Sequence, residues 1–74
     1  MENIKLKQYY ELFTDAWKLF REHSNPDESV DFWKRYEEEV ERLDKKHNES
    51  EMLRKILLAV TDELVKIEKE KINE

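Results

Sequence analysis

The sequence predicts an all-α fold, an up-down-up three-helix bundle with helices over about 3–23, 26–47 and 49–72 in a single domain, 1–74. Apolar residues recur every three or four positions in three blocks separated by short polar stretches. The chain has no glycine and one proline, so the residues that favour the positive φ angles of tight β-turns are missing. Two short connections make neighbouring helices antiparallel.

The first helix is predicted because aromatic residues follow helical spacing between Ile4 and Phe20. It should end near His23, since Asn25 precedes Pro26 and is pushed out of the helical region. Asn25 is then expected to cap the second helix, with Ser29 as the alternative cap. His23 should lie in the last helical turn, where its ring can cap the carbonyl end.

The second helix is indicated by a stripe from Trp33 to His47 at three-four spacing, and Asn48 ends it or caps the third helix. The third helix should place Met52 and Ala59 on its buried face. The predicted core is Phe13, Trp17, Phe20, Trp33, Tyr36, Val40, Ile56, Val60, Leu64 and Ile67. A core of this size gives a stability of only about 3–5 kcal/mol, so association would help the fold.

No catalytic, cofactor or metal site is expected, and an enzyme is not predicted. The chain has two histidines and no cysteine, whereas a metal site needs three or four convergent ligands. Asp44 and His47 share a helix face, and a structural role for His47 is favoured over a ligand pair. The serines and threonines lack a glycine elbow, and the usual phosphate-binding loops also need glycine.

Glu63 is the carboxylate that stands out, because it falls within the apolar arc of the third helix. A carboxylate at a buried edge needs a donor, and Tyr36, Trp17 or Trp33 could supply one. The alternative is that Glu63 is simply exposed at the edge of the core.

The whole net charge of −5 is carried by the stretch from Asp27 to Glu41, which holds seven acids and two bases. Asp31, Glu38 and Glu41 form a possible acidic face. The face is either solvated and braced by pairs four residues apart, or it binds a basic protein or mimics nucleic acid. Direct binding to nucleic acid is not expected, because phosphates would be repelled.

Leu58, Val65 and Ile72 recur every seven residues, outside the predicted core arc of the third helix. They are either scattered surface apolars or a seam for a protein partner or a second copy. The seam gives the leading expectation for function, a non-enzymatic interaction or self-associating module. An acidic regulator acting through the second helix is the alternative.

The run Phe13, Trp17, Phe20, then Phe32-Trp33, then the segment 57–64 resembles a group of small uncharacterised helical proteins of Gram-positive bacteria, some carried on mobile elements. The resemblance implies a bacterial intracellular protein and brings no established activity or catalytic residues. No signal-peptide or membrane-spanning run is expected, and the lack of cysteine fits a reducing interior. We therefore expect a cytoplasmic protein without a membrane partner.

Overall fold

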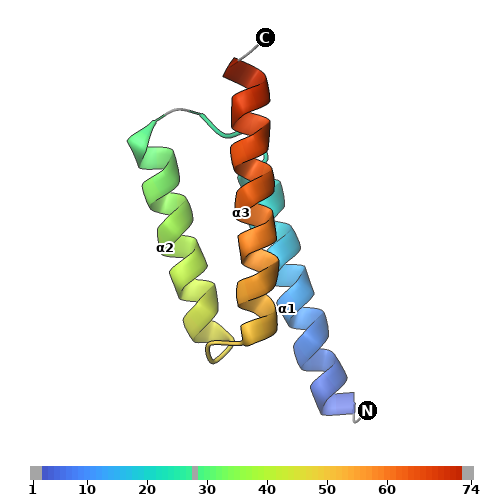
Figure 1. Ribbon diagram of the computed structural model, residues 1–74. Helices are drawn as coiled ribbons and strands as arrows, with labels where there is room; N and C mark the ends of the chain where they lie inside the picture. Colours follow the sequence, from blue (N-terminus) through green and yellow to red (C-terminus); the bar gives the residue numbers. More distant parts are fainter. Residues whose placement is uncertain (1–2, 28, 73–74) are drawn as a thin grey trace.

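The computed structural model describes residues 3–27 and 29–72 and confirms the three-helix prediction. The helices are α1 (Asn3–Glu22), α2 (Val30–Lys46) and α3 (Glu51–Ile72). They run up, down and up, so α1 and α3 are parallel and α2 is antiparallel to both (Figure 1). The helix ends differ from the predicted 3–23, 26–47 and 49–72 by up to four residues.

Serines cap α2 and α3: Ser29, the alternative cap predicted for α2, is found in place of Asn25, and Ser50 is found in place of Asn48. The Ser29 hydroxyl accepts a hydrogen bond from the Phe32 amide at 3.1 Å, so α2 begins four residues later than predicted from Asn25. The Ser50 hydroxyl accepts one from the Leu53 amide at 3.2 Å in the same way. Both serines satisfy amides that the first helical turn leaves without a partner.

The core is built mainly from leucines. Its buried members are Leu12, Ala16, Leu19, Tyr36, Leu43, Leu53, Leu57 and Leu64, and Phe20, Trp33, Val40, Ile56, Val60 and Ile67 pack partly buried against them. Tyr36 and Leu64 thus lie in the core as predicted, and six other predicted residues lie at its margin.

Phe13 and Trp17 were predicted to be in the core, and this is wrong, because both are about half exposed. The other helices pack instead on the face of α1 that carries Leu12, Ala16 and Leu19. The apolar arc of α1 is wider than one packing face, and the small Ala16 side chain allows close approach on the leucine side. Met52 and Ala59, predicted on the buried face of α3, are also exposed.

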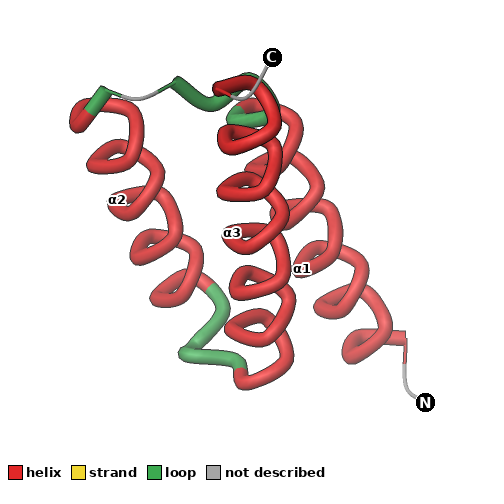
Figure 2. The backbone as a smooth tube through the Cα atoms, turned by 45° about the horizontal axis from the view of Figure 1, so that its top comes forward, coloured by secondary structure: helices red, strands yellow, loops and turns green. Residues whose placement is uncertain are grey.

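The three helices do not pack equally closely on one another. α3 packs closely on α1 and more loosely on α2, which diverges from it (Figure 1, Figure 2). The N-terminal end of α1 extends past the α2–α3 turn, so the molecule is 48 Å long although its longest helix has 22 residues. Such a helix spans about 33 Å. Two surfaces follow from this arrangement, one on α1 and one between α2 and α3.

Candidate interaction surfaces

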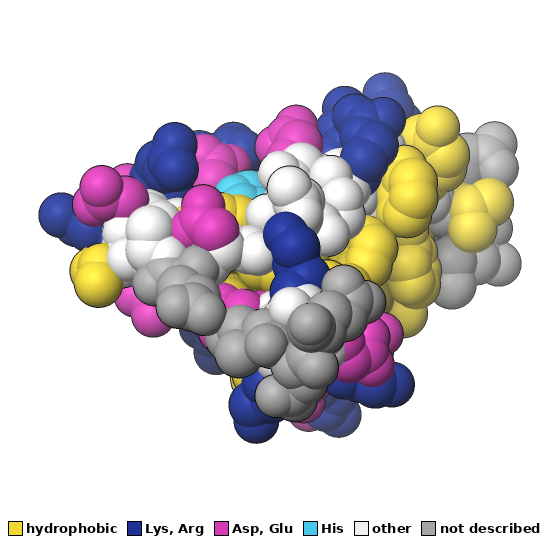
Figure 3. Space-filling view, turned by 90° about the horizontal axis from the view of Figure 1, so that it is seen from above, with side chains coloured by type: hydrophobic (Ala, Val, Ile, Leu, Met, Phe, Trp, Pro, Cys, Tyr) yellow, Lys and Arg dark blue, Asp and Glu magenta, His cyan; other side chains and the backbone are white. Residues whose placement is uncertain are grey.

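The α1 aromatic face consists of Leu6, Tyr9, Tyr10, Phe13 and Trp17. Their exposed fractions run from 40% for Tyr9 to 70% for Tyr10. Figure 3 shows hydrophobic side chains gathered on the side of the molecule where α1 lies. The ring of Trp17 stacks on Phe20, which is partly buried, with centroids 6.3 Å apart, so the face continues into the core margin.

The area of this face is large for so small a protein. With about 150–250 Å² for a large side chain, the five residues expose on the order of 500–600 Å². The largest apolar patch on a typical monomer is about 300–600 Å². The α1 aromatic face therefore lies at the upper end of what monomers expose.

The α2–α3 groove is the second surface. It encloses about 540 Å³ and has an apolar floor and a charged rim. The lining residues are Trp33, Tyr36, Glu37, Val40, Glu41, Asp44, Arg54, Leu57, Leu58 and Thr61. The floor residue Leu58 is 65% exposed, whereas its neighbour Leu57 is buried.

The three residues of the predicted seam of α3 do not form one exposed surface in the described part of the chain. Leu58 lies in the α2–α3 groove, Val65 is partly buried, and the side chain of Ile72 lies outside the described part of the chain. The seven-residue spacing thus identified one exposed apolar side chain, Leu58, which lies in the floor of this groove and not on an outer face.

The predicted acidic face is divided between two sides of α2. Asp31 and Glu38 are exposed and line a shallow depression with Lys34, whereas Glu41 lines the α2–α3 groove. The pairs predicted to stabilise this face were Asp31 with Arg35, Lys34 with Glu38, and Glu38 with Arg42, and none of them forms a salt bridge in the described residues. Instead, Glu39 pairs with Arg42 at 2.8 Å and Glu41 lies 3.7 Å from Lys45.

At the lower end of the groove, Arg54 makes two hydrogen bonds to Asp44. Its Nε donates to Oδ1 at 2.8 Å and its Nη2 donates to Oδ2 at 3.0 Å. The guanidinium holds the pKa of the Asp44 carboxyl below its ordinary value. This bidentate ion pair neutralises the positive charge of Arg54 at the groove.

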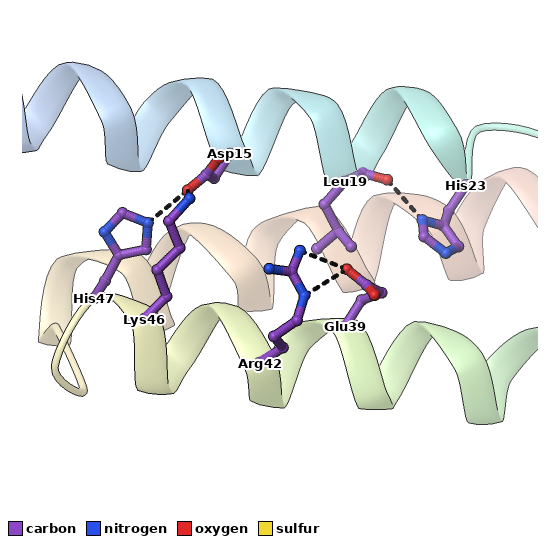
Figure 4. Close-up of polar contacts among 7 residues, drawn as sticks. All are labelled: Asp15, Leu19, His23, Glu39, Arg42, Lys46 and His47. Carbon is purple, nitrogen blue, oxygen red and sulfur yellow. Dashed lines mark hydrogen bonds and ion pairs between the residues drawn. The ribbon is translucent and has the colours of Figure 1, made fainter.

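A polar cluster joins α1 to the end of α2. The Asp15 carboxylate accepts hydrogen bonds from Lys46 Nζ at 2.8 Å and from His47 Nε2 at 2.7 Å (Figure 4). The side chains of Asp15 and His47 are 14% and 10% exposed. Burial acts to raise the pKa of Asp15, but the two hydrogen bonds and the charges outweigh it and lower the pKa. His47 thus has the structural contact that was favoured for it, with Asp15 as the partner that sequence reasoning missed.

His23 and the aromatic residues of α2 form a cluster at the opposite end of the bundle. The His23 Nδ1 donates to the Leu19 carbonyl at 2.8 Å, so the ring caps the last turn of α1 (Figure 4). The same ring meets Phe32 and Tyr36 edge-on, with centroids 5.5 and 5.2 Å away. His23 therefore packs against the aromatic residues of α2, whereas Trp17, predicted to be in the core, is exposed.

The prediction that Glu63 is a buried hydrogen-bonded carboxylate is wrong, because Glu63 is exposed. The Trp33 indole donates to Glu68 Oε2 at 2.7 Å instead. The Tyr36 hydroxyl lies 2.7 Å from Thr61 Oγ1, which in turn donates to the Leu57 carbonyl. Burial raises the pKa of Tyr36, and the bond to Thr61 opposes that shift.

Within 3–27 and 29–72, no three His, Cys, Asp or Glu side chains converge in the way a metal ion would require. None of the helices over the same ranges has the length and apolarity needed to cross a bilayer. Comparisons with known protein families, with curated proteins and with solved structures give no match to this chain. The resemblance drawn from the sequence therefore stays a prediction.

Proposed function

We propose that this protein is a non-enzymatic interaction module that self-associates as a homodimer through the α1 aromatic face. The observation that supports the proposal is the exposure of five large apolar side chains along one helix. The predicted seam of α3 is not used here, since Leu58 lies in the α2–α3 groove and Val65 is partly buried. We also propose a cytoplasmic location, which the lack of cysteine supports.

The area of the face supports a second copy as the occupant. A stable interface buries about 800 Å² on each partner, with an apolar centre and a polar rim. The α1 aromatic face supplies on the order of 500–600 Å² of that centre, by the same estimate as above. Exposed polar residues around it, such as Lys7 and Lys18, would complete the rim.

The spacing along α1 is suited to antiparallel pairing around a two-fold axis. Residues placed equally far from Phe13 match in character, since Leu6 lies seven residues before it and Phe20 seven residues after it. In the same pairing Tyr9 and Tyr10 would meet the region of Trp17. An isologous contact of this kind closes on itself. It also gives the projecting N-terminal end of α1 a surface to pack on.

The first experiment is sedimentation equilibrium over a wide concentration range, with the Tyr10→Lys and Trp17→Lys variants. Each variant should raise the dimer Kd about tenfold or more, because a charge would be buried at the centre of the interface. Both residues are well exposed in the structure, so the helical circular dichroism spectrum should be retained. The matched control is Leu58→Lys, which alters an equally exposed apolar residue on the other surface and should leave the Kd unchanged.

The second experiment tests the interface by disulfide cross-linking, which needs only one introduced cysteine because the sequence has none. A Phe13→Cys variant should form a disulfide-linked dimer under mild oxidation, because the two-fold axis brings Phe13 of both copies together. Leu58→Cys should form it far more slowly. A wild-type chain that stays monomeric at millimolar concentration, or a dimer that only the Leu58 variants affect, would refute the proposal.

A further inference from the structure

The α2–α3 groove is separate from the α1 aromatic face and has a different chemical character. We propose that it binds a basic amphipathic helix from a partner protein. The proposal goes beyond self-association, because it assigns a second surface and a different ligand. It depends on three properties of the groove: its apolar floor, its acidic wall and the loose packing of its two helices.

The floor offers apolar contact along both helices. Trp33, Tyr36 and Val40 contribute from α2, and Leu57 and Leu58 contribute from α3. Leu58 is 65% exposed, so a large part of the floor is still open to solvent. A helix lying in such a groove inserts apolar residues at positions i, i+3 or i+4, and i+7.

The wall on α2 is acidic. Glu37 and Glu41 line it, and both are exposed. Among the described residues, the only basic side chain lining the groove is Arg54, which is bound to Asp44. The nearest cation found for Glu41 is Lys45, at 3.7 Å, with both side chains largely exposed, so that contact screens its charge weakly. The segment from Asp27 to Glu41 also carries the full net charge of the chain. Lysine or arginine beside the apolar anchors of a partner would meet these carboxylates, whereas an acidic partner would be repelled.

The looser packing of α2 on α3 leaves the α2–α3 groove accessible to a further helix. α3 packs less closely on α2 than on α1, and both ribbon views show α2 diverging from α3 (Figure 1, Figure 2). The Trp33 indole reaches across to Glu68 and the Tyr36 hydroxyl to Thr61. These polar contacts join the two helices. A helix added in the groove would give the four-helix arrangement common in bundles.

The experiment titrates the full-length chain with a fluorescent amphipathic peptide of about four helical turns, made of leucine at helical spacing and lysine elsewhere. The control peptide has the same composition with leucine and lysine alternating, which does not give one apolar helical face. Anisotropy reports binding. In a Trp17→Phe background, the emission of Trp33 reports whether the groove is occupied, and it should shift to shorter wavelength only with the amphipathic peptide.

Charge variants on α2 then locate the site. Glu37→Lys together with Glu41→Lys should weaken binding about tenfold at low salt, and Leu58→Lys should weaken it by a similar factor. Glu38→Lys together with Asp31→Lys is the matched control, since it makes the same change of charge on the same helix away from the groove. This control should change affinity by no more than about twofold, the part due to net charge alone.

Three results would overturn the proposal. The first is equal weakening by the two pairs of charge variants, which would show attraction to the whole helix and not to the groove. The second is binding of both peptides with equal affinity, or no binding of either at about 100 µM. The third is binding that is lost in Tyr10→Lys and retained in Leu58→Lys, which would place the peptide on the α1 aromatic face.

Discussion

Replacing Glu49 by glycine should stabilise this protein. Glu49 and Asn48 adopt φ values of 58° and 56° in the turn that follows α2. The left-handed conformation costs a residue with a Cβ about 1–2 kcal/mol, and glycine avoids this cost. Glycine also lowers the free energy of unfolding by about 0.5–1 kcal/mol, because it gives the unfolded chain more conformational entropy. The 3.7 Å contact of Glu49 with Arg54 is exposed and contributes little. The net gain should be about 0.5–1 kcal/mol, which corresponds to a Tm rise of about 3–6 °C.

Thermal unfolding followed by circular dichroism would measure this shift, at one fixed concentration because the proposed dimer would make Tm concentration-dependent. Asn48→Gly should gain less, since asparagine tolerates the left-handed region better than glutamate does. Glu51→Gly is the matched control, because Glu51 begins α3 and glycine in a helix is destabilising. A lower Tm for Glu49→Gly than for the wild type would refute the reasoning about this turn.

Two further predictions concern the core and the α1–α2 contact. Leu53 is fully buried, whereas Leu58 is 65% exposed. Leu53→Ala should therefore lower the free energy of unfolding by about 2–5 kcal/mol, and Leu58→Ala should change it by about 0.5 kcal/mol or less. Urea denaturation would measure both values. The Asp15 contribution to stability should be present above the ordinary pKa of 3.8 and lost as pH falls through the lowered folded-state value. Asp15→Asn should flatten this part of the pH–stability profile, and an unchanged profile would contradict the role assigned to Lys46 and His47.

The number, order and direction of the helices could be predicted from the sequence, because periodicity and the position of Pro26 act locally. Which side of α1 is buried could not. Phe13 and Trp17 lie at helical spacing, and so do Leu12, Ala16 and Leu19, on the neighbouring part of the same arc. Periodicity gives the width of an apolar arc but not its orientation, which depends on the helices that pack on it.

The polar contacts between helices were harder to predict than the helices themselves. The Trp33 indole binds Glu68 and not Glu63, and the axial register of α2 against α3 decides between two carboxylates five residues apart. Asp15 was missed as the partner of His47 for the same reason, since the two residues are far apart in sequence. Two residues of the α1 aromatic face, Phe13 and Trp17, were predicted to be in the core. They are exposed because the orientation of α1 was predicted incorrectly.

The exposed N-terminal part of α1 has a consequence for how the chain folds. Residues Lys5 to Glu11 are all exposed, so this stretch has little tertiary support. Isolated helices shorter than about 12–15 residues are marginal in water. Amide hydrogens here should exchange rapidly in dilute protein and become protected as the concentration rises, because a second copy would supply the missing contacts. Assembly and the completion of secondary structure would then be one coupled equilibrium.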